Sequence, residues 1–166
     1  VHNFQNTTSA MERLFKLAKV SQENPMWGGL AKSKFRYGEP MGDKAIREIE
    51  DPSEYIYGAV EAAEKHVGSN IDSGGILFTK YEKICLVSSE GPEGQDERSA
   101  IELSIRAFAN RDESGHGVEC NSLLKGFNPA RAGDKAGEIA EMAKRPKAGK
   151  TGKYDIIFEP LFVGSM

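Results

Sequence analysis

The stretch Ser99–Asn110, with the sequence SAIELSIRAFAN, decides the fold class that we predict. Its odd-numbered positions carry the apolar side chains of Ile101, Leu103, Ile105 and Ala107. The positions between them include the charged residues Glu102 and Arg106. An alternation of apolar and polar residues with a period of two is typical of a β-strand with one buried face. We therefore expect a strand here, with its apolar face in the core.

Neighbouring β-rich runs extend this strand to a sheet. Upstream, the apolar runs Gly75–Thr79 and Ile84–Ser88 predict two short strands joined by the polar residues Lys80–Lys83. Downstream, the turn Arg111–Gly115 leads into His116–Leu124, a weaker candidate strand that glycine interrupts. Consecutive strands separated by turn residues predict an antiparallel meander.

Helix patterns lie before and after the predicted sheet. Ser9–Val20 begins with Ser9 and Glu12, a spacing typical of a capping box. Asp51–Val67 and the segment after Asn128 each begin with an Asx-Pro pair, which suits the first turn of a helix. The expected buried stripes are Ile56, Ala59, Val60, Ala63 and Val67 in the second helix, and Ala132, Ala136, Ile139, Ala140 and Ala143 in the third. These elements predict an α+β fold, an antiparallel β-meander covered by helices.

The connection between the first two helices is predicted to be extended. Residues 22–52 hold prolines and glycines and show little periodicity. We expect the aromatic residues Trp27, Phe35 and Tyr37 to anchor this connection to the body of the protein, because large aromatic side chains gain most from burial.

The last part of the chain begins with a basic cluster of Lys144, Arg145, Lys147, Lys150 and Lys153. A solvated linker is the favoured interpretation of this cluster, and contact with phosphate groups is the alternative. The apolar run Tyr154–Pro160 follows and predicts a strand with little solvent exposure.

The composition limits the class of protein. With 166 residues, the chain is long enough for one domain, or for one domain and part of a second. A net charge of -3 and a pI of about 5.7 argue against a large basic surface for nucleic acid, and two cysteines exclude a disulfide framework. No apolar run approaches the roughly 18 residues that cross a bilayer, and no signal-peptide pattern is present, so we expect a soluble, cytoplasmic protein. Because the chain opens on Val1 and stops just after an apolar segment, we expect it to be cut at both ends.

Few side chains form a pattern that indicates chemistry. His116 and Cys120 would share one face of a strand and could approach a metal ion together, but the His-Glu-x-x-His pattern of a zinc hydrolase is missing. Cys85 lies within an apolar run and is interpreted as a buried thiol. The turn Ser114–Gly117 lacks the Gly-x-Ser-x-Gly elbow of a serine nucleophile. We therefore assign no catalytic, cofactor-binding or metal-binding residue.

In their order along the chain, these pieces resemble the middle of the TldD/PmbA family, metalloprotease-like proteins also called modulators of DNA gyrase. Leu17–Ser21 resembles the end of the family's early helix, and Asp51-Pro52-Ser53 resembles the start of the next one. The strand Ser99–Asn110 and the turn Ser114–Gly117 follow in family order. The most specific piece is Gly152–Pro160, which is similar to a strand that leads into the family's C-terminal domain.

The resemblance implies a fragment of a larger two-domain protein. Residues 1–160 would be a partial N-terminal domain, and residues 161–166 the truncated start of the C-terminal domain. In TldD-type members a zinc-binding His-Glu-x-x-x-His helix follows shortly after the strand. Here Leu161–Met166 holds neither His nor Glu, which is closer to the PmbA-type members that lack the metal ligands. No catalytic residue carries over, and zinc would belong to the full-length protein or to its partner.

The resemblance also implies a role in a cytosolic peptide-cleaving assembly. This region would enclose a peptide or unfolded polypeptide, and exposed strand edges would bind it through main-chain hydrogen bonds. We expect this chain to be inactive alone and to form a homodimer or heterodimer with a family member, without membrane contact. Two alternatives stay open: a non-catalytic PmbA-type partner subunit, and a nucleic-acid or gyrase-associated binding module, which the acidic composition does not favour.

Overall fold

The computed structural model of the protein describes residues 6–32, 36–69 and 71–164. The chain divides into two compact units. The first unit holds the chain up to Gly38 together with Cys85–Gly94, and the second holds Glu39–Ile84 together with the chain from Gln95 onward.

The first unit contains helix α1 (Thr7–Val20) and the turn that joins the first two strands. In that turn the Ser88 amide donates to the Pro92 carbonyl over 2.8 Å, and Gly91 has a φ of 112°, which favours glycine. The predicted helix is confirmed, but the predicted capping box is wrong. The helix starts at Thr7, so Ser9 lies inside it, and the side chain of the N-cap residue Asn6 makes no capping hydrogen bond.

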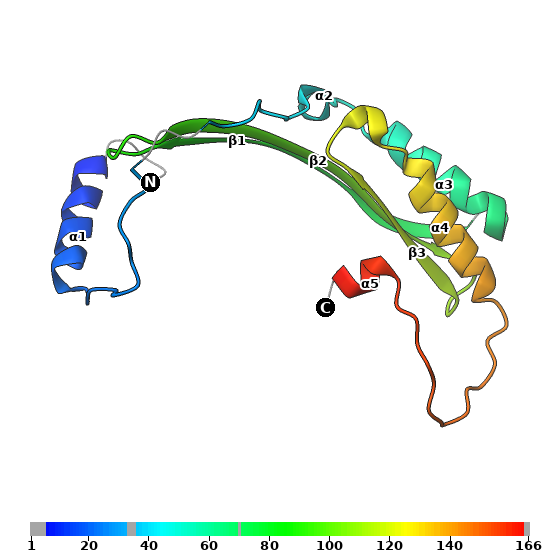
Figure 1. Cartoon of the computed structure of the whole chain (residues 1–166). Helices are drawn as coiled ribbons and strands as arrows, with labels where there is room; N and C mark the ends of the chain where they lie inside the picture. Colours follow the sequence, from blue (N-terminus) through cyan, green and yellow to red (C-terminus); the bar gives the residue numbers. More distant parts are fainter. Residues whose placement is uncertain (1–5, 33–35, 70, 165–166) are drawn as a thin grey trace. The chain divides into compact units, whose positions relative to one another are not determined.

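The second unit contains most of the sheet and the remaining helices (Figure 1). Its helices are α2 (Lys44–Arg47), α3 (Ser53–Val67), α4 (Pro129–Met142) and α5 (Pro160–Gly164). The strands are β1 (Asp72–Val87), β2 (Glu93–Phe108) and β3 (Ser114–Asn121), in the order β1-β2-β3. This order confirms the predicted antiparallel meander and the α+β fold class.

Strand β1 differs from the sequence prediction, because it is one continuous strand of 16 residues rather than two short ones. The predicted turn Lys80–Lys83 was wrong for a physical reason: it contains no Gly, Pro, Asn or Asp to favour a turn, and its side chains find partners while extended. Tyr81 and Lys83 both contact Glu97 on β2, and Lys80 pairs with Glu82. The polar side chains of this run therefore contact the neighbouring strand, and the chain does not turn here.

The predicted core face of β2 is confirmed. Ile101, Leu103, Ile105 and Ala107 are all buried, and they form the centre of the hydrophobic core. The antiparallel register sets Ile105 beside Gly117 and Ala107 beside Gly115. The glycines of β3 therefore lie on the same face as the core residues of β2, which is the face that the helices cover.

Helix α4 packs against β3 with almost no side chain between the two backbones. An added Cβ at Gly115 would overlap the carbonyl of Ala136, and one at Gly117 would overlap the carbonyl of Ala132. Two residues of a strand span about 6.8 Å and four residues of a helix rise about 6 Å, so the two pairs of residues match in spacing. Ala132, Ala136 and Ala140 are fully buried in this contact, as the alanine stripe predicts.

The other side of α4 makes an equally close contact with α3 (Figure 1). An added Cβ at Gly133 would overlap the carbonyl of Ala59, and one at Gly137 would lie 2.6 Å from the carbonyl of Ala63. Because both residue numbers rise by four from one contact to the next, the two helices run in the same direction. Ala62 is also buried, although we did not predict it, whereas the predicted Ile56 is 42% exposed.

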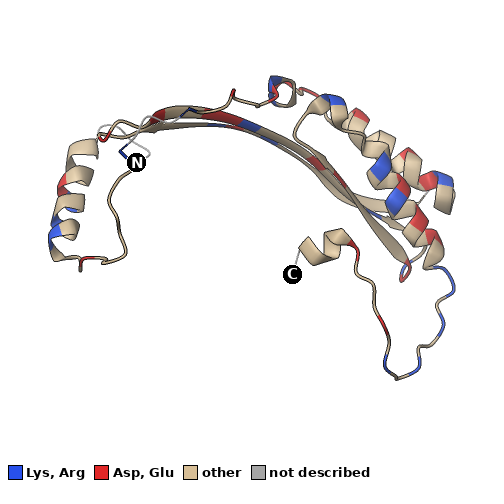
Figure 2. Cartoon of the chain, viewed as in Figure 1, with Lys and Arg blue, Asp and Glu red and all other residues tan. Residues whose placement is uncertain are grey.

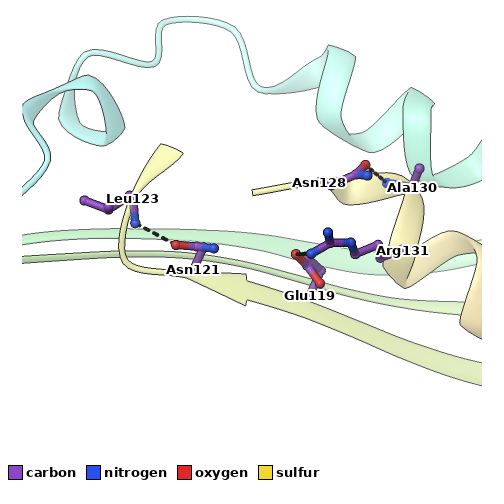
Figure 3. Close-up of polar contacts among 6 residues, drawn as sticks. All are labelled: Glu119, Asn121, Leu123, Asn128, Ala130 and Arg131. Carbon is purple, nitrogen blue, oxygen red and sulfur yellow. Dashed lines mark hydrogen bonds and ion pairs between the residues drawn. The ribbon is translucent and has the colours of Figure 1, made fainter. Parts of the chain in front are cut away.

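Asx side chains start both α3 and α4, and Figure 3 shows the one at Asn128. Asp51 accepts a hydrogen bond from the Ser53 amide over 2.9 Å, and Asn128 accepts one from the Ala130 amide over 3.1 Å. Figure 3 also shows Arg131 of α4 facing Glu119 of β3, with 3.3 Å between their charged groups. The helix starts read from the sequence are thus confirmed, with Pro52 standing just before the first helical residue of α3.

The strand predicted at Tyr154–Pro160 is wrong. This segment is coil followed by the short helix α5, and its apolar side chains are exposed, Ile157 at 97%. A strand needs a neighbour to receive its main-chain hydrogen bonds, and no described strand pairs with this segment. An ion pair of 3.1 Å between Lys135 and Glu159 does connect its end to α4.

The aromatic anchors predicted in residues 22–52 have mixed outcomes. Trp27 is 67% exposed, so its role as an anchor is wrong. Tyr37 lies against Gly94, where an added Cβ would come within 2.8 Å of its ring. Phe35 lies outside the described residues.

We predict that Gly133→Ala destabilises the protein by about 1–3 kcal/mol, because the new methyl group has no space against the backbone of α3. Gly58→Ala is the matched control, since it is also a helix position and its added Cβ would lie 3.8 Å from Pro129. There the substitution should stabilise by about 0.5–1 kcal/mol. Urea unfolding of both variants measures the difference, and equal stability would contradict the close helix contact.

Candidate functional site

The described residues do not supply the ligands of a metal centre. His116 and Cys120 occupy the same face of β3, as predicted, but no group of three or more His, Cys, Asp or Glu side chains in residues 6–32, 36–69 and 71–164 could hold a metal ion. His116 Nε2 instead lies 2.8 Å from the Ser104 hydroxyl. Cys85 is exposed, so its prediction as a buried thiol is wrong. No step through a metal can be derived for this part of the chain.

The segment Ser114–Gly117, predicted to be a turn, is the first half of β3 and contributes to packing. Both of its glycines are buried beneath α4, and the backbone there has no room for a substrate. Near the end of α3, the Nε2 atom of His66 lies 3.4 Å from the carboxylate of Asp134 on α4. These residues therefore contribute to the packing of α3 and α4.

The face of the sheet opposite the helices carries exposed apolar side chains on β1. Leu77 packs against the core, so its neighbours Ile76 and Phe78 point to the other face, where they are 65% and 52% exposed. Ile84 has the same parity and is 41% exposed. Exposed apolar side chains that follow one another along a strand are a feature of interaction surfaces.

Strand β1 is also an edge strand of the sheet that the structure describes. It pairs with β2 only, so one row of its main-chain N–H and C=O groups faces away from the sheet. Such a row is a template for a further extended chain. The exposed edge and the apolar side chains together make β1 the candidate binding element.

A cavity of about 630 Å³ lies beside β1 on the side of α2. Its wall includes Tyr81 and Lys83 of β1, Glu97 of β2, and Lys44 and Arg47 of α2. The Tyr81 hydroxyl donates to Glu97 over 2.5 Å, and the Lys83 ammonium donates to the same carboxylate over 3.1 Å. The Arg47 guanidinium lies 5.9 Å from the centre of the Tyr81 ring.

A polar network holds α2 in place over this cavity. The Asp43 carboxylate accepts hydrogen bonds from the Ala45 amide over 3.0 Å and from the Leu124 amide over 2.8 Å. The Ser99 hydroxyl accepts from the Asp43 amide over 2.8 Å and donates to the Ser122 carbonyl over 2.7 Å. The sequence analysis missed both α2 and this network, although an Asp just before a short apolar-containing run is a helix-start signal.

Comparison with known proteins identifies the family. Residues 40–144 match the family model described as the PmbA/TldA metallopeptidase central domain. The chain belongs to this family. No curated protein matches the chain.

A solved structure supports the PmbA/TldD fold assignment. The chain is similar to a crystal structure of a candidate modulator of DNA gyrase from Bacteroides thetaiotaomicron, with a TM-score of 0.64 and 16% sequence identity. The similarity covers 81% of this chain and 33% of that chain, so the PmbA/TldD chain described here spans about a third of the length of the solved one. The family resemblance predicted from the sequence is confirmed. The domain boundary between residues 160 and 161 stays a prediction, and residues 165–166 lie outside the described part.

Two surface findings complete the description of this PmbA/TldD chain. Within the described residues, no helix has both the length and the apolar character to cross a membrane. Figure 2 shows basic residues spaced along the coil that follows α4, which agrees with the predicted solvated linker.

The hydrogen bond between Tyr81 and Glu97 moves both pKa values. Donation by the Tyr81 hydroxyl, and then by Lys83, lowers the pKa of Glu97 below its ordinary value of 4.5. The same hydrogen bond raises the pKa of Tyr81 above its ordinary value of 10.0. The contribution of Glu97 to folding stability is therefore present above pH 4.5 and is lost as pH falls through its lowered pKa. The contribution of Tyr81 to folding stability is present below pH 10.0 and is lost as pH rises through its raised pKa.

We predict that Tyr81→Phe lowers the stability near neutral pH and that this difference from the wild type shrinks both in acid and in alkali. The Phe ring keeps the contact with Arg47, so the variant removes only the hydroxyl. Unfolding curves across pH measure the effect, with Tyr57→Phe, at an exposed tyrosine of α3, as the matched control for removal of a hydroxyl group. A pH-independent difference would contradict a hydrogen bond to the ionised Glu97.

Proposed function

We propose that this chain is the substrate-enclosing region of a PmbA/TldD-type peptidase and that it binds extended segments of peptide or unfolded polypeptide along β1. The observation that supports the proposal is the combination, on one strand, of an unpaired edge and exposed apolar side chains. The family assignment makes polypeptide the substrate class to test.

The physical basis is strand addition. An extended peptide beside β1 would exchange main-chain hydrogen bonds with it, a mode that requires little side-chain specificity. The part of β1 in the second unit, residues 72–84, is on the order of 40 Å long, which exceeds the length needed by a peptide of about ten residues. Alternate side chains of the peptide would then lie next to Ile76 and Phe78, and burying these side chains would add affinity.

Cleavage is assigned to a part of the assembly outside the described residues. The chain spans a third of the similar solved structure, and its described residues hold no ligand set for a metal. In this proposal the catalytic zinc belongs to the full-length protein or to a partner that is another family member. Binding along β1 would be the same in a catalytic chain and in a non-catalytic partner subunit, so the proposal is tested by binding.

We predict that an unstructured synthetic peptide of about ten residues, with alternating apolar and polar side chains, slows amide exchange in residues 72–84 of the full-length protein. Hydrogen-exchange mass spectrometry measures this, with the buried face of α4 as the internal reference. Protection appears in β1 because added main-chain hydrogen bonds shield its free edge. The absence of any protection there would contradict the proposal.

We also predict that Phe78→Lys lowers the affinity for this peptide by about tenfold, since it removes apolar contact area. Ile157→Lys is the matched control, because Ile157 is an exposed apolar residue outside the sheet. Fluorescence anisotropy of a labelled peptide gives both affinities. An equal loss in the two variants would point to nonspecific apolar binding.

A further inference from the structure

The cavity between α2 and β1 contains more positive than negative charge. Four cationic side chains line it, Lys44, Arg47, Lys80 and Lys83, together with a single carboxylate, Glu97. Lys83 pairs with Glu97, and Lys80 pairs with Glu82, each over 3.1 Å. Among the described residues, no carboxylate forms an ion pair with Lys44 or Arg47. Lys44 interacts electrostatically with Glu97, which already pairs with Lys83, so positive charge exceeds negative charge at this cavity.

The cations are held on a rigid frame rather than on a mobile loop. Ile46, between Lys44 and Arg47 in α2, is 1% exposed and packs in the core. The Asp43 carboxylate fixes the start of α2 through two amide hydrogen bonds, and the Tyr81 ring supports the Arg47 guanidinium. A site whose charged groups are fixed before binding loses less entropy when a ligand enters.

The chemistry of these groups fits a carboxylate. A guanidinium presents parallel N–H donors that match the two oxygens of a carboxylate, and an ammonium adds a point charge beside them. Ile46 and Ile49 give the cavity an apolar part next to the cations. A ligand with a carboxylate attached to a short apolar group, such as the last residue of a peptide, satisfies both parts.

We propose that this cavity binds the C-terminal carboxylate of the peptide that lies along β1. The inference rests on the proposed function for the source of the carboxylate, and β1 provides the link, because Thr79, Lys80, Tyr81 and Lys83 of that strand line the cavity. Recognition of a chain end gives the site a preference for peptides with a free terminus near the strand. The edge of β1 alone would not distinguish a chain end from an internal segment.

The test compares one peptide sequence in two forms, with a free C-terminal carboxylate and with a C-terminal amide. For the full-length wild-type protein we expect the acid to bind about tenfold tighter than the amide, the size typical of a charge-assisted hydrogen bond. Arg47→Gln should bring this ratio close to one, because the affinity for the acid falls much more than the affinity for the amide. Lys44→Gln should lower the ratio in the same direction, and it provides a second variant if Arg47→Gln disturbs the packing on Tyr81.

Lys150→Gln is the matched control, because it removes one positive charge from the exposed coil and should leave the ratio unchanged. A ratio of one in the wild type, with both peptides bound, overturns the carboxylate site and leaves the proposed function standing. A ratio that Lys150→Gln lowers as much as Arg47→Gln also overturns it, since the effect would then be general electrostatics.

If neither peptide binds, the proposed function fails and the cavity is tested alone with acetate and with inorganic phosphate. The readout is the amide resonances of residues 43–49 in the wild type and in Arg47→Gln. A response to acetate that Arg47→Gln removes supports a carboxylate site independent of peptide binding. A response to phosphate without one to acetate, or no response to either, overturns the inference.

Discussion

The contact of α4 with the backbones of β3 and α3 is the constraint on which the rest of the structure depends. Gly115 and Gly117 face α4 from one side, and Gly133 and Gly137 of α4 face α3 on the other. At this separation even a methyl group would overlap main-chain atoms, so the backbones of neighbouring elements come into direct dispersion contact at these glycines. The direction and register of α3 and α4 follow from these glycine positions.

This constraint also determines what the helices leave uncovered. Because α3 and α4 lie close together on one face of the sheet, the opposite face of β1 keeps Ile76 and Phe78 in solvent. The short helix α2 is placed separately, by hydrogen bonds of Asp43 and Ser99 and not by a glycine contact. The edge of β1 and the cavity beside α2 are therefore two surfaces in the described part of the chain that stay open to a ligand, and they adjoin the same strand.

Sequence reasoning succeeded where a local pattern has one physical cause. The alternation in β2 predicted its buried face, and the Asx-Pro pairs predicted the starts of α3 and α4, because these signals depend on residues adjacent in the chain. It failed at Lys80–Lys83 and at Tyr154–Pro160. At Lys80–Lys83 the polar run stays extended because Tyr81 and Lys83 bind Glu97 on the neighbouring strand. At Tyr154–Pro160 the apolar run has no described strand beside it. Both outcomes depend on residues distant in sequence.

The sequence by itself determined the α+β class, the core face of β2 and the alanine stripe of α4. It also determined the resemblance to the PmbA/TldD family, which the match of the family model to residues 40–144 confirms. Only the tertiary structure decided that β1 is a single edge strand and that Lys44 and Arg47 meet Tyr81 and Glu97 in one cavity. The physical reason is that periodicity fixes which face of an element is buried, whereas the side chains that meet across elements depend on strand register and on how closely two backbones can approach.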